Sequence, residues 1–319
     1  MSDDRYLVLA GGLSHERDVS LRSGRRVLDA LRTAGVDADV RDADADLLRV
    51  LADGRYAAVL VALHGGPGED GALREVLELS GVPYVGSTPS ACRIAWDKPT
   101  VKAIAGRAGI STPHSAVLPH ATFRELGAGA VIDRLVAHLG LPLMVKPARG
   151  GSALGATAVR SAEELPSAMV TCFSYGEAAL VEQLVAGTEL AVTVVDTGDG
   201  PRALPAVEIR PVDGVYDYAA RYTAGATEFF APARLDEAGA AEVARVAVAA
   251  HEALGLRDLS RVDLVVDAGE TGGGAVQLLE VNVSPGMTET SLLPMAVEAA
   301  GLSFGSLLQE LLEQAAARG

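Results

Sequence analysis

The segment Glu280-Val281-Asn282-Val283-Ser284-Pro285-Gly286 indicates the fold more specifically than any other stretch of the chain. It closes a predicted strand, Val276–Val281, with polar residues and a proline–glycine turn. Side chains alternate between the two faces of a strand, so Glu280 and Asn282 point to the same face. A carboxylate and an amide therefore lie together at the end of a late strand.

The preceding predicted strand, Arg261–Val266, has the same arrangement, with Arg261 and Asp263 on one face. A buried carboxylate costs free energy unless it is paired or bound to a cation. Asp263, Glu280 and Asn282 supply the hard oxygen donors that Mg²⁺ prefers. A solvated polar face of an antiparallel sheet is the alternative, and the turn that directly follows Asn282 favours a metal site.

A glycine-rich loop follows a third predicted strand, Leu143–Lys146. The loop Pro147–Gly155 contains three glycines and Ser152. A lysine at a strand end, with flexible glycines and a hydroxyl after it, can cradle phosphate groups. The loop is not a Walker A motif, because Gly-Lys-Ser/Thr opening a helix is absent. An ordinary hairpin turn is the alternative.

The N-terminal region alternates apolar strands with amphipathic helices, which predicts a small parallel α/β domain. Ligands in such sheets bind at the carboxyl ends of the strands. Both glycine-rich loops of this region fall at that edge. The predicted elements are strands Tyr6–Ala10 and Ala57–Leu63 and helices Asp18–Ala34 and Ala72–Ser80, with Ser87–Trp96 as the connection out of the domain and Ala203–Ile209 as a later strand.

The two N-terminal loops each place a carboxylate beside a glycine-rich turn, an arrangement suited to an ammonium group. The loops are Gly11–Glu16 and His64–Gly71, and their candidate residues are Glu16 and Glu69. His64 is either a binding residue or a structural histidine. Asp70 is better explained as an acid that stabilises a helix N-terminus. G-x-G-x-x-G is absent from the first loop, so a dinucleotide fingerprint is not supported.

A long segment without regular period, Val215–Ala233, contains three tyrosines and an arginine between Tyr216 and Tyr222. We expect it to be either a lid over a ligand or a surface loop pinned by tyrosines.

The bulk composition limits the classes of partner. The formal net charge of −15 argues against nucleic acid and an anionic membrane surface, because both require clustered cations. Cys92 and Cys172 lack metal-type spacing, which favours two free thiols in a reducing compartment. The acidic N-terminus is unlike a signal peptide, and no apolar run has the length of a membrane helix. We therefore expect a cytoplasmic protein.

Taken together and in order, these motifs resemble the D-alanine–D-alanine ligases of the ATP-grasp superfamily. The likeness extends from Gly11 to Phe304 and includes Gly-Gly-x-Ser-x-Glu, His-Gly-x-x-Gly-Glu-Asp-Gly, the Lys-Pro glycine loop and Tyr-Asp-Tyr. The resemblance implies an α/β (α+β) class and a three-domain ATP-grasp fold, with an N-terminal α/β domain over residues 1–95, a central domain over 96–185 and a C-terminal domain over 186–319. It also implies a homodimer.

The resemblance assigns ATP and two Mg²⁺ ions, for which Mn²⁺ can substitute. Lys98 and Lys146 match the lysines on the phosphates, and Arg221 stands where the family usually has a lysine. Glu182 and Leu184 match the adenine positions and Glu189 the ribose position. The implied metal ligands are Asp263, Glu280 and Asn282, in agreement with the strand periodicity.

The same resemblance assigns the amino-acid substrates. Glu16, with His64 and Glu69 nearby, matches the group that holds the first D-alanine, and Arg261 with the Gly286 backbone matches the oxyanion site. The second-substrate and loop positions match Ser152, Tyr222, Ser291 and Leu292. The implied reaction joins two D-alanines through an acyl phosphate, for peptidoglycan precursors.

Several residues depart from the family pattern. Gly150 replaces a common acidic residue, Val283 a threonine, and Glu289 with Thr290 the usual Ser-His pair. A carboxylate beside the second-substrate site disfavours a bare substrate carboxylate. The acceptor is therefore left open between D-alanine and another D-amino acid used in a specialised pathway. A non-catalytic nucleotide-binding protein is the third interpretation.

Overall fold

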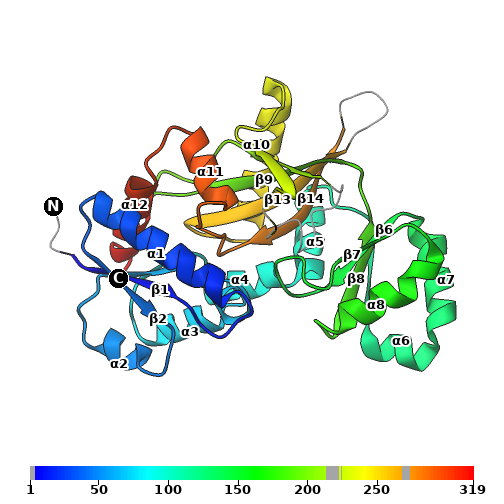
Figure 1. Ribbon diagram of the computed structural model, residues 1–319, viewed down its shortest axis with the longest axis horizontal. Helices are drawn as coiled ribbons and strands as arrows, with labels where there is room; N and C mark the ends of the chain where they lie inside the picture. The colour runs from blue at the N-terminus through cyan, green and yellow to red at the C-terminus, as the bar shows by residue number, and fades with distance from the viewer. Residues whose placement is uncertain (1–3, 213–222, 224, 268–273) are drawn as a thin grey trace.

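The computed structural model describes residues 4–212, 223, 225–267 and 274–319, and these residues contain three β-sheets. A parallel sheet lies at one end of the molecule and a small antiparallel sheet at the other (Figure 1). A larger antiparallel sheet lies between them. The predicted residues Arg221 and Tyr222, and the Tyr216–Tyr222 segment as a whole, fall outside the described residues.

The N-terminal sheet is parallel, as predicted, with strand order β2-β1-β3-β4. Its apolar strands are buried on both faces, which is typical of parallel sheets. Tyr6 and Val8 face a core formed with α1 and α12, while Leu7 and Leu9 face a second core formed with α2 and α3. The elements are β1 (Tyr6–Ala10), α1 (Arg17–Thr33), β2 (Ala38–Asp42), α2 (Leu47–Ala52), β3 (Ala58–Val61), the 3₁₀ turn η1 (Gly66–Gly68), α3 (Ala72–Leu79), β4 (Tyr84–Val85) and α12 (Phe304–Ala316).

The large sheet has the order β12-β11-β9-β13-β14, with β10 paired to β9. The prediction of one strand over Ala203–Ile209 is wrong, because the pairing stops at Pro205 and resumes at Val207. Proline has no N–H to donate to a ladder. The elements are β9 (Gly187–Val195), β10 (Arg202–Ala203), β11 (Val207–Pro211), β12 (Thr227–Phe230), α10 (Glu237–Ala253), β13 (Leu259–Asp267), β14 (Val276–Asn282) and α11 (Leu292–Ala299).

The small sheet has the order β5-β8-β6-β7 and is antiparallel. Alternate residues of β6 separate its faces: Leu143 and Val145 enter a core with α7 and α8, while Lys146 points to the other face. The elements are β5 (Ser115–Pro119), α6 (His120–Leu126), α7 (Ala128–Leu139), β6 (Leu143–Pro147), β7 (Thr157–Val159), η2 (Ala162–Glu164), α8 (Leu165–Phe173) and β8 (Ala178–Gln183).

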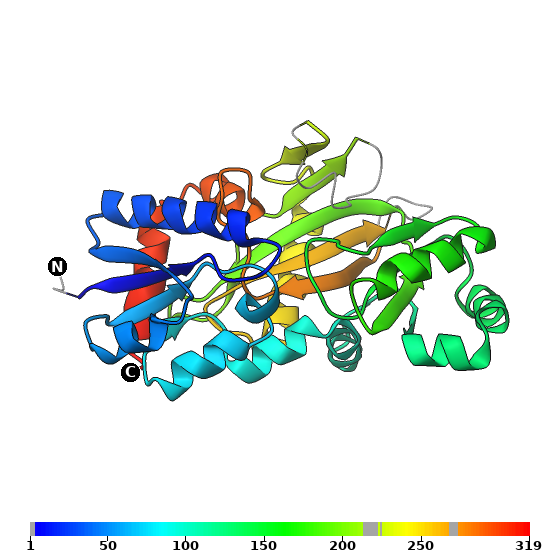
Figure 2. The same ribbon diagram turned by 60° about the horizontal axis from the view of Figure 1, so that its bottom comes forward.

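The expected connection Ser87–Trp96 is largely helical. Thr88 caps α4 (Pro89–Trp96) by accepting from the Ala91 N–H, and proline occupies the first helical position. Asp97 then caps α5 (Lys98–Arg107). The helix α4 leads away from the parallel sheet along one side of the molecule, and α5 follows it on the way to the small sheet (Figure 2). They position Lys98 and Lys102 between the large and small sheets.

The described residues test two further expectations. Cys92 and Cys172 are buried and free, as predicted. Among the described residues, no single helix combines the length and apolar composition needed to cross a membrane. In the same described ranges, α11 and α12 counted together meet that criterion, and they are bent by 104° at the break between them. The domain boundaries at residues 95 and 185 stay predictions.

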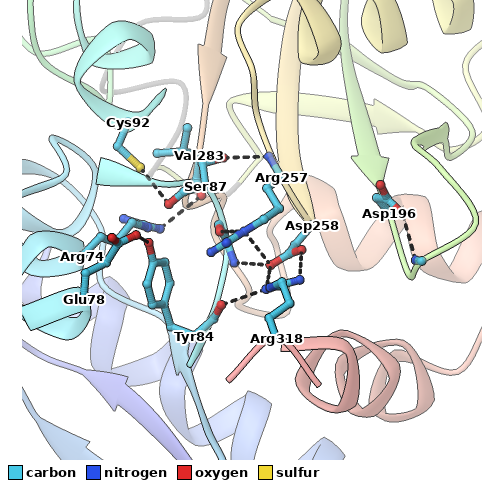
Figure 3. A network of polar contacts seen from close by, with 12 residues as sticks. Arg74, Glu78, Tyr84, Ser87, Cys92, Asp196, Arg257, Asp258, Val283 and Arg318 are labelled. Atoms are coloured by element: carbon cyan, nitrogen blue, oxygen red, sulfur yellow. Dashed lines mark hydrogen bonds and ion pairs between the residues drawn. The ribbon is translucent and has the colours of Figure 1, made fainter. Parts of the chain in front are cut away.

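A buried carboxylate ties the C-terminal end of the described chain to the parallel sheet (Figure 3). Arg318 donates to both oxygens of Asp258, at 2.8 and 2.7 Å, and to the Tyr84 carbonyl at 3.0 Å. The Gly86 N–H donates to the same carboxylate at 2.8 Å. Asp258 is fully buried, so these contacts compensate its desolvation.

We predict that Arg318→Ala lowers the free energy of unfolding by about 3 kcal/mol, because it leaves part of a buried carboxylate without a partner. Urea titration followed by circular dichroism measures the change. Arg245→Ala is the matched control, because Arg245 pairs with Glu242 on an exposed helix face and its loss leaves stability unchanged. Equal stability of Arg318→Ala and wild type would contradict the role of this contact.

Candidate active site

Two cavities lie on either side of a shared wall. The first has a volume of about 1000 Å³ and the second about 960 Å³. Residues that line both cavities are Lys98, Gly150, Gly151 and Glu280. Ligands in the two cavities would therefore meet beside a lysine, a carboxylate and a glycine-rich loop.

The register of β13 on β14 confirms the expected placement of four polar residues on one face. Arg261 lies opposite Asn282, and Asp263 lies opposite Glu280. The Arg261 guanidinium donates two hydrogen bonds of 2.7 Å to the Asp263 carboxylate. This bidentate pair compensates two largely buried charges within the site.

The donor set on this face fits a divalent cation. Asp263 and Glu280 supply carboxylate oxygens from adjacent strands, and the Asn282 amide oxygen lies one alternation further along β14. Asn282 Oδ1 also accepts from the Ser284 N–H at 2.7 Å, which orients the amide. Within the described part of the chain, no group of three or more His, Cys, Asp and Glu side chains is placed to hold a metal ion. The fit thus depends on two carboxylates and an amide.

Lys146 and Glu182 line the second cavity, and Lys102 contacts Glu182 without lining that cavity. Lys146 on β6 contacts Glu182 on β8 at 2.5 Å, and Lys102 on α5 contacts the other oxygen of Glu182 at 2.8 Å. Burial raises the pKa of the Glu182 carboxyl, but the charges of Lys146 and Lys102 outweigh it and the net pKa is lowered. Burial lowers the pKa of Lys102, and Glu182 offsets only part of that effect. Glu182 therefore stays ionised between two cations.

Lys98 stands where the cavities meet. It is the first residue of α5, its ammonium donates to the Gly150 carbonyl at 2.5 Å, and it lies 3.7 Å from Glu280. Burial lowers the pKa of this lysine, and the Glu280 charge opposes the shift. The contact ties the glycine-rich loop to α5.

Of the other residues expected at a nucleotide, Leu184 and Glu189 line the second cavity, whereas Ser152 lines the first. The Leu184 N–H donates to the Pro142 carbonyl at 3.0 Å, which anchors the backbone of this lining residue. Val185, which follows it, lines the same wall and was not identified from the sequence. Its apolar side chain gave no signal of its own.

In the first cavity, Glu16 and Ser152 are brought together from segments far apart in the chain. The Ser152 hydroxyl donates to Glu16 Oε1. A Cβ at Gly65 would lie 2.5 Å from Glu16 Oε2, and Gly65 has a φ of 68°, so both space and conformation require glycine there. The glycines of the His64–Gly71 loop thus leave room for the Glu16 carboxylate.

Glu69 lies deeper in the same cavity. Its Oε1 accepts from the Gly65 N–H at 2.9 Å, and the side chain is buried. Burial, with a smaller contribution from the negative charge of Glu16, raises the pKa of Glu69 to about 7. An added cation in this cavity favours the ionised form. Asp70 accepts from the Ala72 N–H at the start of α3, as expected for a helix N-terminal acid.

His64 joins the parallel sheet to the proline–glycine turn. Its Nδ1 lies 2.9 Å from the Ser284 carbonyl and its Nε2 lies 2.8 Å from Ser23 Oγ. A carbonyl only accepts, so Nδ1 carries the proton and Nε2 accepts from the serine. Burial lowers the pKa of His64, which agrees with a neutral ring. His64 was expected to be either a binding residue or a structural histidine. These contacts are those of a structural histidine, although His64 also lines the first cavity.

The turn after β14 completes the first cavity. The Ser284 hydroxyl donates to the Leu63 carbonyl at 2.7 Å, which fixes the turn to the end of β3. The Thr288 N–H donates to Ser291 Oγ at 3.0 Å. Gly286, Ser291 and Leu292 line the cavity.

Two features of the acceptor side differ from the sequence expectation. Glu289 and Thr290 are both exposed, but Thr290 belongs to the described lining of the first cavity and Glu289 does not. Arg22 lines the cavity and was not identified from the sequence. It follows Glu16 and Val19 at intervals of three along α1, and that helical spacing was the available signal.

We predict that Glu16→Gln lowers the pKa of Glu69 below about 7, because it removes a negative charge that opposes ionisation. The pKa stays above the ordinary glutamate value, since burial persists. Carboxyl ¹³C NMR titration measures it, with Glu69→Gln identifying the resonance. An unchanged or higher Glu69 pKa in Glu16→Gln would show that the two carboxylates do not interact.

Comparison with known proteins agrees with this geometry. The family described as "D-ala D-ala ligase C-terminus" matches residues 104–313. The D-alanine–D-alanine ligase of Bordetella petrii is 42% identical over 311 residues, covering 98% of this chain and 92% of the relative.

Solved structures have the same fold over nearly the whole chain. The VanG D-Ala:D-Ser ligase from Enterococcus faecalis superposes with a TM-score of 0.83 at 27% identity, covering 98% of this chain and all of the other. The D-alanine–D-alanine ligase from Bacillus anthracis complexed with ATP gives 0.78 at 28% identity, covering 98% and 96%. The expected ATP-grasp fold is confirmed, and the chain belongs to the D-alanine–D-alanine ligase family.

Proposed function

We propose that this protein joins two D-alanines to D-alanyl-D-alanine at the expense of ATP, and so supplies a peptidoglycan precursor in the cytoplasm. The observation that carries the proposal is the pair of cavities with a common wall at Lys98, Gly150, Gly151 and Glu280. A phosphate donor in one cavity and a carboxylate in the other meet at a place built from a cation, a carboxylate and loop backbone.

ATP occupies the second cavity. Lys98 and Lys146 neutralise its phosphates, the loop from Gly150 to Ser152 approaches them through backbone N–H groups, and Leu184 and Val185 offer an apolar surface to the base. Glu189 lines the cavity where a ribose hydroxyl needs an acceptor. The ATP complex of the Bacillus anthracis relative supports this assignment.

Asp263, Glu280 and Asn282 are the residues that would hold two Mg²⁺ ions. When bound, the ions would neutralise the phosphate oxygens and so reduce the charge that an attacking carboxylate meets. Asp263 and Arg261 form a pair that keeps both side chains oriented on the sheet face.

Glu16 binds the ammonium group of the first D-alanine, and Glu69 adds a second negative charge behind it. The substrate carboxylate then points toward the shared wall. Its oxygen attacks the γ-phosphorus and ADP leaves, which yields an acyl phosphate. The resemblance places Tyr222 and Arg221 on a lid that excludes water from this intermediate; both lie outside the described residues.

The neutral amine of the second D-alanine attacks the acyl carbonyl, and phosphate leaves. The Arg261 guanidinium and the Gly286 N–H stabilise the negative oxygen that develops on that carbon. Ser152, which donates to Glu16, positions the donor site, while Ser291 and Leu292 form the wall beside the acceptor.

D-Alanine is the favoured acceptor because Glu289 does not belong to the described cavity lining, while the Arg22 cation does. The likeness to a D-Ala:D-Ser ligase favours D-serine as the second candidate. Thr290, whose hydroxyl can bond a polar acceptor side chain, is the residue that would support it. The protein acts as a homodimer on small molecules, without nucleic acid or membrane.

Phosphate release with ATP and Mg²⁺, measured across a panel of D- and L-amino acids, tests the function. Release with D-alanine alone, and dipeptide by mass spectrometry, is the expected result. Release only when D-serine accompanies D-alanine would establish the second candidate. ATP binding without release on any substrate would instead identify a non-catalytic nucleotide-binding protein.

We predict that Glu280→Gln lowers kcat by orders of magnitude with an unchanged thermal midpoint, because one carboxylate of the cation site becomes a neutral amide. Steady-state kinetics and thermal unfolding measure the two effects. Glu310→Gln, an exposed change on α12, is the control and keeps wild-type activity. Near-wild-type turnover in Glu280→Gln would remove Glu280 from the ligand set.

We also predict that Arg22→Ala raises KM for the acceptor D-alanine by about tenfold, the effect of one lost charge-assisted hydrogen bond, and leaves KM for ATP unchanged. Arg25→Ala, one turn away on the exposed face of α1, provides the comparison. If the two variants behave alike, Arg22 does not contact the acceptor.

A further inference from the structure

Lys102 is a buried cation that the proposed reaction does not use. It lies four residues after Lys98 on the same face of α5, and the residue is 8% exposed. It lines a separate hollow, with Thr112 and His114, and does not belong to the described lining of either active-site cavity. A buried lysine needs a reason, because removing an ammonium group from water costs free energy.

The partner of Lys102 is the same carboxylate that holds Lys146. On paired strands, Met144 lies opposite Glu182 and Lys146 lies opposite Leu180, so Lys146 and Glu182 are diagonal neighbours on one face. Lys102 reaches Glu182 from α5 instead. Glu182 Oε1 contacts Lys146 at 2.5 Å and Oε2 contacts Lys102 at 2.8 Å, with the Glu182 side chain 3% exposed.

This arrangement matters for a lysine that must bind phosphate. In the ligand-free structure Lys146 is engaged by Glu182. If Lys146 were its only counter-ion, moving that ammonium toward a polyphosphate would leave a buried carboxylate without a partner, which is strongly unfavourable. With Lys102 on the second oxygen, Glu182 keeps a counter-ion when Lys146 turns to the ligand.

We propose that Lys102 is a positioning residue of the nucleotide cavity: it is the permanent counter-ion of Glu182 and thereby releases Lys146 to bind ATP. The inference rests on the proposed ATP site. It assigns Lys102 no contact with ATP, with the amino acids or with the reacting atoms.

Lys102→Met tests the proposal, because methionine fills similar space without charge. We expect the Kd of an ATP analogue that resists hydrolysis, measured by calorimetry with Mg²⁺, to rise by about tenfold or more. KM for ATP rises with it, while KM for D-alanine and kcat at saturating ATP stay near wild type. A purely structural role would instead lower the thermal midpoint and kcat without this selectivity.

A double-mutant cycle separates action through Glu182 from any other effect. In the Glu182→Gln background there is no carboxylate to compensate, so adding Lys102→Met changes the Kd of the analogue by less than about twofold. Lys102→Arg, which retains the charge, restores binding relative to Lys102→Met. Arg107→Met removes an exposed cation from the same helix and serves as the matched control.

Binding of the ATP analogue to the wild-type protein distinguishes failure of the Lys102 proposal from failure of the proposed function. Wild type that does not bind the analogue contradicts the ATP site itself. Wild type that binds, with Lys102→Met binding equally well, overturns the role of Lys102 alone. That role is also overturned if adding Lys102→Met to the Glu182→Gln variant raises the Kd of the analogue as much as it does in the wild type. If Lys102→Met does not fold, Lys102→Gln, which also removes the charge, carries the same predictions.

Discussion

The pairing of β13 with β14 sets the positions on which the rest of the site depends. Its register places Asp263 opposite Glu280 and Arg261 opposite Asn282. A shift of either strand by one residue would send its two polar side chains to the opposite face, which packs against α4, α5 and α10 in an apolar core. That core holds the register, because Val262, Leu264 and Val281 are buried in it. The apolar face of the sheet thus fixes the geometry of the polar one.

Charge compensation explains how so many ionised groups remain at the centre of the protein. The Asp263 carboxylate is paired with Arg261, Glu182 is paired with two lysines, and Lys98 donates to a loop carbonyl. A buried charge without such a partner costs several kcal/mol. ATP and metal ions bring their own charges. In the proposed complex, lysines that pair with carboxylates in the ligand-free protein pair with phosphates, and carboxylates pair with the metal ions. The neutral His64 ring, by contrast, connects two segments through both nitrogens and needs no counter-ion.

The sequence predicted the features that follow from local rules. Strand alternation identified the shared face of Asp263 and Glu280, and the continuous apolar run Tyr6–Ala10 indicated a parallel strand buried on both faces. The helix α4 was missed as a helix although its local cap signals, Thr88 and Pro89, were available in the sequence. Local rules were insufficient for contacts between distant segments. They also could not find Lys102, whose partner Glu182 lies eighty residues away in the sequence. Contacts of that kind arise only when the sheets pack against each other. The exposure of Glu289 likewise depends on the tertiary structure and could not be predicted from the sequence.

The central claim is that a substrate carboxylate in the first cavity attacks a phosphate in the second across the shared wall. D-Alanine labelled with ¹⁸O in its carboxylate tests it most directly, by mass spectrometry of the phosphate released during dipeptide formation. Because the attacking oxygen leaves with phosphorus when the amine displaces phosphate, the account predicts one ¹⁸O in the phosphate for each dipeptide formed. Phosphate free of label, with dipeptide still formed, would contradict it.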